Sequence, residues 1–159
     1  MRTTTTRIRC LCAAACATPL LFAGVAGAGA ATALAPTASP SEILQLVNAE
    51  RAKAGCPALN ENAQLTKAAQ VFADDASKNH LTNHTGSDGS SIQKRMQDAG
   101  YNPGSGSENM SWGTTDAQKI LDGWNKSPAH HGAIVNCSFK DTGVAVSGDY
   151  AIQVFATPA

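Results

Sequence analysis

The sequence has 159 residues, with 12 basic and 12 acidic side chains and a formal net charge of zero. A chain of this length can bury one hydrophobic core but not two. Beyond residue 41 the Lys and Arg residues form no cluster, so neither nucleic acid nor an anionic membrane surface is an expected partner.

The first 35 residues differ in composition from the rest. Arg2, Arg7 and Arg9 come first, and positions 10–35 then carry no charge. A basic start, an apolar run and small residues at its end are typical of a secretory signal peptide. We predict a signal peptide over residues 1–30 and a disordered lead-in over 31–40. Cleavage after residue 28 or 33 is an alternative to cleavage after residue 30.

An uncleaved membrane anchor is the other interpretation of this leader. The apolar run is long enough to span a bilayer, but its glycines and its proline make a poor helix. No second apolar stretch approaches membrane length, so no transmembrane segment is expected after cleavage. We therefore expect a secreted, extracellular protein, and a monomer.

Removal of the leader changes both the charge and the cysteine count. Nine basic and twelve acidic residues remain, which gives a net charge of −3. The remaining cysteines are Cys56 and Cys137, and in an oxidising compartment they are expected to form a disulfide. Closing that loop would stabilise the fold by about 4 kcal/mol on the chain-entropy model. Two free thiols or a metal-binding pair are the alternatives.

The chain after the leader begins with two predicted helices. Ser39, Pro40 and Glu42 form a helix start, because serine caps, proline suits the first helical position and glutamate follows three residues after the cap. Gly55 marks its end. A second helix follows Asn60, where apolar residues recur at helical spacing over residues 65–76.

The middle of the chain alternates loops and short helices. A polar loop is expected over 84–91, a short helix over 92–99, a Pro/Gly/Ser-rich flexible stretch over 101–107 and an extended piece over 108–112. A helix over 116–124 places Trp124 in the core, and Ser127 with Pro128 begins another short helix.

The last part of the chain has the residue pattern expected of β-strands. Residues 143–146 and 150–155 are predicted strands, joined as a hairpin across Ser147, Gly148 and Asp149. Helices followed by a small antiparallel sheet predict an α+β fold in which the helices cover the sheet.

Common catalytic templates are missing from the sequence. It contains no HExxH, GxSxG or phosphate-binding glycine loop. His84 opens a Gly/Ser-rich loop, Glu108 lies beside apolar residues, and His130 follows a helix start. Two imidazoles and a carboxylate could converge on a divalent cation such as Zn²⁺, Mg²⁺ or Ca²⁺. The alternatives are a surface histidine, a glutamate bonded to backbone and a capping histidine.

Short segments in a fixed order resemble the CAP superfamily (cysteine-rich secretory proteins, antigen 5 and pathogenesis-related 1), in its short bacterial secreted branch. The matching segments are Val47–Arg51, Ala58–Asn60, Asn83–Ser90, Ser107–Met110, Trp124–His130, Asn136–Val146 and Tyr150–Phe155. The resemblance covers residues 41–159. It implies an α–β–α sandwich with a central cleft lined by two histidines and two acidic residues, which binds divalent cations in some members.

The resemblance also assigns positions in that cleft. His84 matches the first histidine, Glu108 the motif glutamate and His130 the histidine of a Ser-Pro-Gly-His motif. Several positions depart from the family pattern. Ser107 and Ala129 replace glycines, Ser127 stands in place of the second acid, and His131 occupies the place of an arginine. The late-strand histidine is absent from Tyr150–Gln153. His131 is a candidate substitute for a missing cleft residue, and Gln153 is a candidate for hydrogen bonding in the cleft, with an ordinary strand-ladder position as the alternative.

Three functions remain open at this point. The resemblance favours a non-enzymatic binding module for a lipid, a sterol or another cell-surface ligand, and the absence of a visible nucleophile–base pair agrees with that. A metal-dependent hydrolase using His84, Glu108 and His130 is the second hypothesis. A structural adaptor of the cell envelope is the third.

Overall fold

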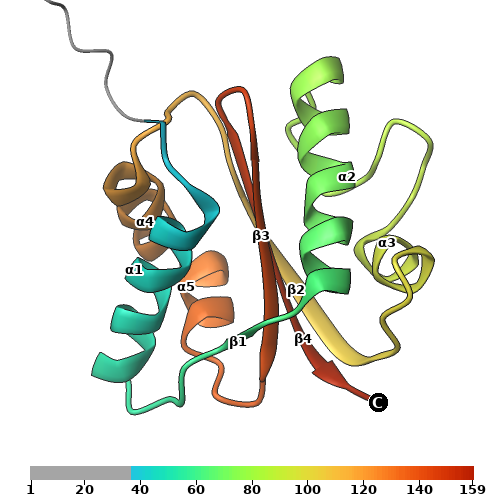
Figure 1. The fold of residues 1–159 in the computed structure, drawn as a ribbon. Helices are drawn as coiled ribbons and strands as arrows, with labels where there is room; N and C mark the ends of the chain where they lie inside the picture. The colour runs from blue at the N-terminus through green and yellow to red at the C-terminus, as the bar shows by residue number, and fades with distance from the viewer. Residues whose placement is uncertain (1–36) are drawn as a thin grey trace, which may run out of the picture. The chain divides into compact units, whose positions relative to one another are not determined.

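The structure is a computed structural model that describes residues 37–159. The predicted signal peptide and most of the predicted lead-in lie outside these residues. The elements follow one another in the order shown in Figure 1: α1 (Pro40–Lys53), β1 (Asn60–Glu61), α2 (Ala63–Asn79), α3 (Ile92–Asp98), β2 (Pro103–Ser111), α4 (Ala117–Lys126), α5 (Pro128–Ile134), β3 (Asp141–Ser147) and β4 (Tyr150–Pro158).

The strands form one sheet in the order β1-β3-β4-β2. β3 and β4 are the predicted hairpin, and β2 pairs with the other side of β4; both pairings are antiparallel. The two-residue strand β1 pairs parallel to β3, a contact that the sequence pattern does not predict. Gly148 has a positive φ of 59° in the hairpin loop, a conformation that glycine adopts at little cost.

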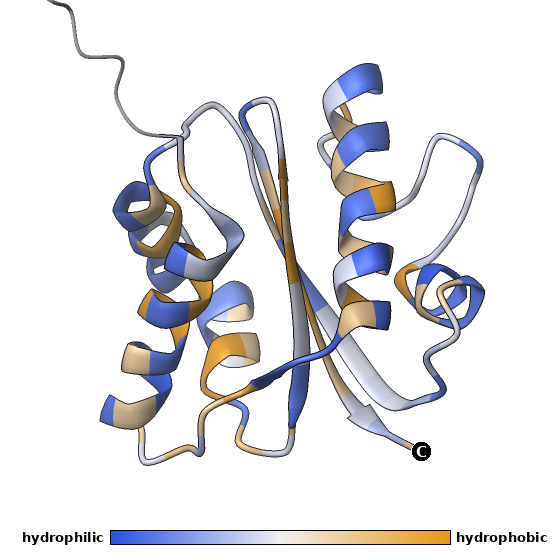
Figure 2. Ribbon diagram, in the orientation of Figure 1, coloured by the Kyte–Doolittle hydropathy of each residue, from blue (hydrophilic) through white to orange (hydrophobic). Residues whose placement is uncertain are grey.

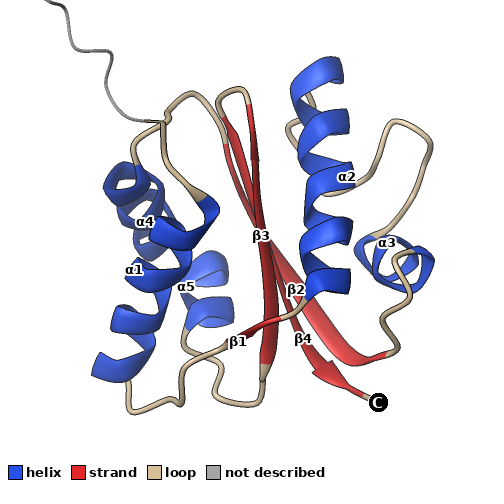
Figure 3. Ribbon diagram, in the orientation of Figure 1, coloured by secondary structure: helices blue, strands red, loops and turns tan. Residues whose placement is uncertain are grey.

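Helices cover both faces of this sheet (Figures 1 and 3). α1, α4 and α5 lie on one face, and α2 and α3 lie on the other. Each layer has its own apolar cluster against the sheet, one built around Trp124 and Phe155 and the other around Phe72 and Ile152. Figure 2 shows the polar sides of the helices turned away from the strands. The predicted α+β sandwich is confirmed.

Local signals in the sequence set the helix boundaries. Ser39 accepts a hydrogen bond from the backbone N–H of Glu42 and caps α1, as predicted. The side chain of Asn62 caps α2. Ala38, inside the predicted lead-in, is buried, and its N–H donates to the carbonyl of Thr115 at 2.7 Å. Within residues 37–159, no helix combines the length and apolar character required to cross a bilayer.

Strand β2 is longer than the sequence indicates. Residues 103–107, expected as a flexible stretch, form its first half and pair with β4 as far as Pro158. Gly106 lies against the side chain of Met96, where an added Cβ would come within 2.6 Å of its methyl group. The partner strand and the contact with α3 therefore impose an extended conformation on residues with low strand propensity.

Two cross-links fasten α1 to the segment before β3. Cys56 and Cys137 form the predicted disulfide. The Arg51 guanidinium, fully buried, donates to the carbonyls of Pro57, Ile134, Asn136 and Phe139 at 2.7–3.1 Å. Burial lowers the pKa of Arg51, but an arginine stays charged in proteins, so these carbonyls must satisfy a buried cation.

Candidate functional site

Glu108 lies on β2 with its carboxylate completely buried beneath α3. One guanidinium nitrogen of Arg95, Nη2, approaches Oε1 at 3.1 Å and Oε2 at 3.0 Å. His84 Nδ1 lies 2.8 Å from Oε1. A carboxylate removed from water needs a counter-charge and hydrogen-bond donors, and these two side chains supply them. The structure thus brings together His84 and Glu108 around a residue that was not predicted, Arg95.

Arg95 connects four parts of the fold. Its Nη1 donates to the Ser90 carbonyl at 2.9 Å, and its Nη2 donates to the His84 carbonyl at 3.2 Å. The guanidinium carbon sits 3.8 Å from the ring centroid of Phe72 on α2, a cation–π contact. A sequence signal for Arg95 existed, because it lies on the same helical face as Ile92 and Ala99, where a charged residue needs a partner.

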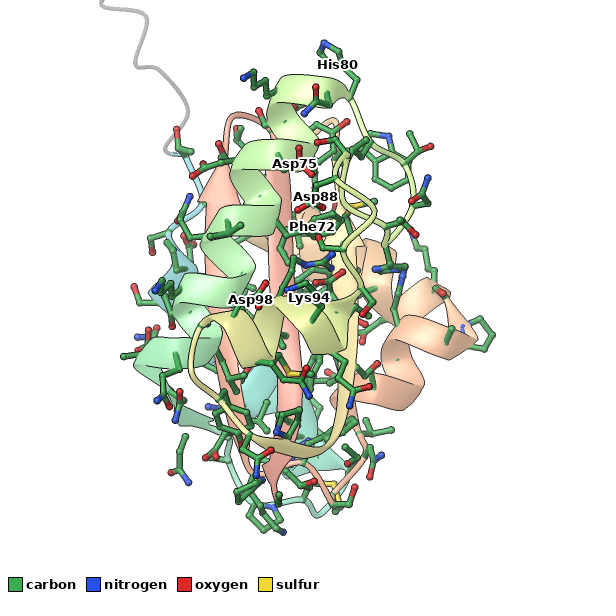
Figure 4. All side chains as sticks on the ribbon, turned by 90° about the vertical axis from the view of Figure 1, so that its right-hand side faces the viewer. Phe72, Asp75, His80, Asp88, Lys94 and Asp98 are labelled. Carbon is green, nitrogen blue, oxygen red and sulfur yellow. A yellow bond between two sulfur atoms is a disulfide. The ribbon has the colours of Figure 1, made fainter. Side chains whose placement is uncertain are left out.

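The loop over residues 84–91 is fastened to α2 rather than free. The Ser87 N–H donates to Asp75 Oδ2 at 2.8 Å, and the Ser87 hydroxyl donates to Oδ1 of the same carboxylate. These bonds lower the pKa of Asp75. Within the loop, the Ser90 N–H donates to Asp88 at 2.8 Å. Figure 4 shows Asp75 and Asp88 in the same region, with Phe72 below them and His80 at the end of α2.

The orientation of His84 follows from its contact with Glu108. A carboxylate only accepts hydrogen bonds, so His84 Nδ1 carries the donated proton and Nε2 is left as the free ring nitrogen. The side chain is 41% exposed, whereas that of Glu108 is buried. Glu108 therefore anchors the imidazole, and Nε2 is the atom that can meet a ligand.

His130 comes from the opposite helical layer. It lies in the first turn of α5, which begins at Pro128 after the Ser127 cap, and its backbone carbonyl accepts a hydrogen bond from Asn109 Nδ2 at 3.1 Å. Successive residues of β2 point to opposite faces, so Glu108 meets α3 while Asn109 meets α5. Because β2 is the outermost strand, side chains of the two layers can approach around its edge. Burial first, and the charge of His84 second, lower the pKa of His130.

Within residues 37–159, the other two predicted cleft residues, Gln153 and His131, make no side-chain hydrogen bond to His84, Glu108 or the His130 ring. Gln153 is fully buried on β4 opposite Asn109, and its Nε2 donates to the Thr142 hydroxyl at 3.1 Å. His131 is half-buried on α5, and its side chain makes no hydrogen bond within residues 37–159. The roles suggested for both residues stay predictions.

A shallow hollow of about 210 Å³ adjoins His130. It is lined by Met110, Ser111, Trp112, Gly123, Trp124 and His130. Trp124 is part of the core, as predicted, and its indole N–H donates to the Met110 carbonyl at 3.2 Å. This hydrogen bond joins two of the residues that line the hollow, one on α4 and one on β2. A larger cavity of about 310 Å³ lies elsewhere, between α3 and the first half of β2.

Of the three residues suggested as ligands of a divalent cation, Glu108 is already paired with Arg95. Both oxygens of Glu108 contact Arg95, whose positive charge opposes a second cation at the same carboxylate. Across residues 37–159, no three His, Cys, Asp or Glu side chains are grouped to hold a metal ion. The imidazoles of His84 and His130 remain the ligands that Zn²⁺ could use. Metal binding stays a prediction.

Comparison with known proteins agrees with this fold. The chain is 26% identical over 119 residues to the uncharacterized membrane protein YlbC of Bacillus subtilis, and 26% identical over 121 residues to the uncharacterized protein YkwD of that organism. Each alignment covers 75% of this chain, but only 34% of YlbC and 47% of YkwD. The chain thus spans less than half the length of either relative.

Solved structures show the same architecture. An extracellular SCP-domain protein of Bacillus anthracis superposes with a TM-score of 0.71 at 24% identity, covering 73% of this chain and 39% of that one. An outer surface protein of Borrelia burgdorferi superposes with a TM-score of 0.68 at 17% identity, covering 79% of this chain and 100% of that one. At these identities the likeness establishes the fold alone.

The family follows from the sequence itself. The profile of the cysteine-rich secretory protein family, CAP, matches residues 44–157, from the first helix to the last strand. This range includes His84, Glu108 and His130 as well as both disulfide cysteines. The chain therefore belongs to the cysteine-rich secretory protein (CAP) family.

Proposed function

We propose that this chain is an extracellular binding module, and that its ligand contacts His84, His130 and the hollow that His130 lines. The predicted leader, the disulfide and the extracellular or outer-surface descriptions of structurally similar proteins support the location. The ligand is a component of a cell envelope or its surroundings, such as a lipid, a sterol or a surface polymer.

The observation that carries this proposal is that the Glu108 carboxylate is already bonded to the side chains of Arg95 and His84. The carboxylate of Glu108 is buried away from any substrate proton, so it does not act as a general base itself, and it holds the two neighbouring side chains in place. No Ser, Thr or Cys side chain in residues 37–159 donates a hydrogen bond to either His84 or His130. The site thus offers imidazole nitrogens and apolar surface for binding, without an activated nucleophile.

A co-sedimentation experiment tests the proposal. The full chain, produced in an exporting host, is mixed with an insoluble envelope fraction of Bacillus subtilis that contains both cell wall and membrane. We expect a saturable bound fraction, reduced at least tenfold in a His84→Ala/His130→Ala variant. His80→Ala is the matched control, because His80 is an exposed histidine at the C-terminal end of α2 whose side chain makes no hydrogen bond to His84, Glu108 or His130 within residues 37–159.

Two results would overturn the proposal. One is an absence of saturable binding to the envelope fraction, and the other is equal binding by the double variant and the unsubstituted chain. Thermal unfolding of each variant, monitored by circular dichroism, shows whether a loss of binding reflects a loss of fold.

A further inference from the structure

Trp112 is an exposed aromatic residue beside the proposed site. It has 48% of its surface exposed, and Val71 is the other large hydrophobic residue that is exposed within residues 37–159. The indole stacks on the ring of Tyr150, with centroids 6.4 Å apart and planes 21° apart. Tyr150 is itself buried. Tyr150 therefore holds the indole of Trp112 in place, while a large part of the indole surface remains open to solvent. Because the ring is already held, less entropy is lost when a partner stacks on it.

The surroundings of Trp112 combine apolar and neutral polar groups. The hollow that it lines is also lined by Ser111 and His130 and by the buried residues Met110 and Trp124. Gly123 leaves its side of the hollow open, because an added Cβ there would meet nothing within 4 Å. No Asp, Glu, Lys or Arg is among the lining residues. A charged ligand group would find no counter-charge in the hollow.

Size and openness decide which neutral ligand fits. At about 210 Å³ the hollow is smaller than the roughly 300–1,000 Å³ of pockets that enclose whole small molecules. It can therefore hold one ring of a larger ligand. An acyl chain in so shallow a site would keep most of its apolar surface in water. A pyranose ring has an apolar C–H face that can pack on indole, while its hydroxyl groups remain hydrated or bond to Ser111 and His130.

We propose that Trp112 and the adjoining hollow form a sugar subsite that takes one neutral pyranose unit of an extracellular glycan. This inference rests on the proposed binding function and names its ligand class. The indole supplies the stacking surface, Tyr150 fixes the indole, and Ser111 and His130 supply hydrogen-bonding groups at the rim.

Tryptophan fluorescence tests this subsite directly, because the sequence contains two tryptophans and Trp124 is only 1% exposed. The full chain is titrated separately with neutral tetrasaccharides of N-acetylglucosamine, α-1,4-linked glucose and β-1,4-linked glucose. We expect at least one of them to give a saturable change in emission and to protect Trp112 from iodide quenching.

Variants separate the subsite from a general effect on the fold. Binding, measured by calorimetry, is expected to weaken roughly tenfold in Trp112→Ala, the loss expected for one aromatic stacking contact. Trp112→Phe is expected to retain part of the affinity, because it keeps an aromatic face. Val71→Ala is the matched control, since Val71 is the other exposed large hydrophobic residue of residues 37–159 and does not line the hollow.

The outcomes distinguish this inference from the function on which it rests. The subsite is overturned if no tetrasaccharide gives a saturable signal, or if Trp112→Ala binds as the unsubstituted chain does. It is also overturned if phosphatidylcholine–phosphatidylglycerol vesicles protect Trp112 while the sugars do not. If the sugars fail but sedimentation with the envelope still depends on His84 and His130, the binding function stands without the sugar subsite.

Discussion

Arg95 Nη2 lies within 3.1 Å of both carboxylate oxygens of Glu108, inside the packed layer between α3 and the sheet. This contact joins a helix to the edge strand, and the same carboxylate holds His84 at 2.8 Å. The position of the exposed imidazole thus depends on a buried ion pair. Several measurable properties follow from this dependence and from the contacts around it.

Removal of Arg95 should destabilise the fold more than removal of a surface charge. Arg95→Met leaves the buried Glu108 without its counter-charge, and we expect a loss of about 3–5 kcal/mol in the free energy of unfolding. Lys94→Ala, which breaks an exposed pair with Asp98, should cost less than about 1 kcal/mol. Urea denaturation measures both. Equal losses in the two variants would contradict the structural role of Arg95.

Arg51 and the disulfide hold the same segment. The losses of unfolding free energy caused by removing each of them should therefore not be additive. Replacement of Cys56 and Cys137 by alanine should cost about 4 kcal/mol, yet leave a folded chain, because Arg51 still holds the carbonyls of residues 134–139. Arg51→Met combined with the cysteine replacements should lose more stability than the sum of the two separate losses, because neither cross-link then holds this segment. A double-mutant cycle by chemical denaturation tests this, and additivity within about 0.5 kcal/mol would argue against coupling.

The pKa of the His130 ring should reflect its burial and its proximity to His84. Its pKa should lie below the ordinary value of 6.5, because burial disfavours the charged ring and His84 adds a second positive charge. His84→Ala should raise the pKa of His130 without restoring 6.5, since burial remains. Proton NMR of the ring across pH 4–9 measures both values. A pKa of His130 that does not change in the variant would contradict the proximity of the two imidazoles.

The same shift has a consequence for stability. The folded state takes up the His130 proton at lower pH than the unfolded state does. The free energy of unfolding should therefore be highest above about pH 7.5 and decrease as the pH falls through 6.5 toward the folded pKa. His130→Gln should remove part of this decrease. A pH series of denaturation midpoints tests it, and an identical slope in the variant would contradict the prediction.

Asp75 should control the order of the loop over residues 84–91. Its folded pKa is depressed by the hydrogen bonds from Ser87, so its contribution to stability is present above the ordinary pKa of 3.8 and is lost as the pH falls below it. Asp75→Asn should speed amide hydrogen exchange in the loop at neutral pH. Asp74→Asn is the control, because Asp74 is exposed and its side chain hydrogen-bonds only to Gln70 among residues 37–159. Equal exchange in both variants would contradict this role.

Cation binding should depend on the histidine nitrogens, because Arg95 contacts both carboxylate oxygens of Glu108. We expect no calorimetric signal with Mg²⁺ or Ca²⁺, which prefer oxygen ligands, and weak Zn²⁺ binding that His84→Ala abolishes and His80→Ala preserves. Stoichiometric metal in the purified chain that disappears in Glu108→Gln would contradict this expectation and restore Glu108 as a ligand.

The sequence alone determined the elements that depend on interactions between residues close together in the chain. Ser39 caps α1 and Gly148 closes the final hairpin because capping and turn chemistry act over a few residues. The spacing of apolar residues placed Trp124 in the core. Cysteine counting paired Cys56 with Cys137, because the expected leader removes every other cysteine.

Tertiary structure decided everything that depends on neighbours distant in the sequence. The glycine-rich start of β2 is a strand because β4 pairs with it, and Gln153 is bonded inside the core to Thr142. Arg95 and Glu108 are 13 residues apart in the sequence, one on a helix and the other on a strand. Neither their spacing nor the composition of the chain indicates that they are in contact. Local propensity reports on a residue and its near neighbours, whereas a buried charge takes its partner from whichever element the fold packs against it.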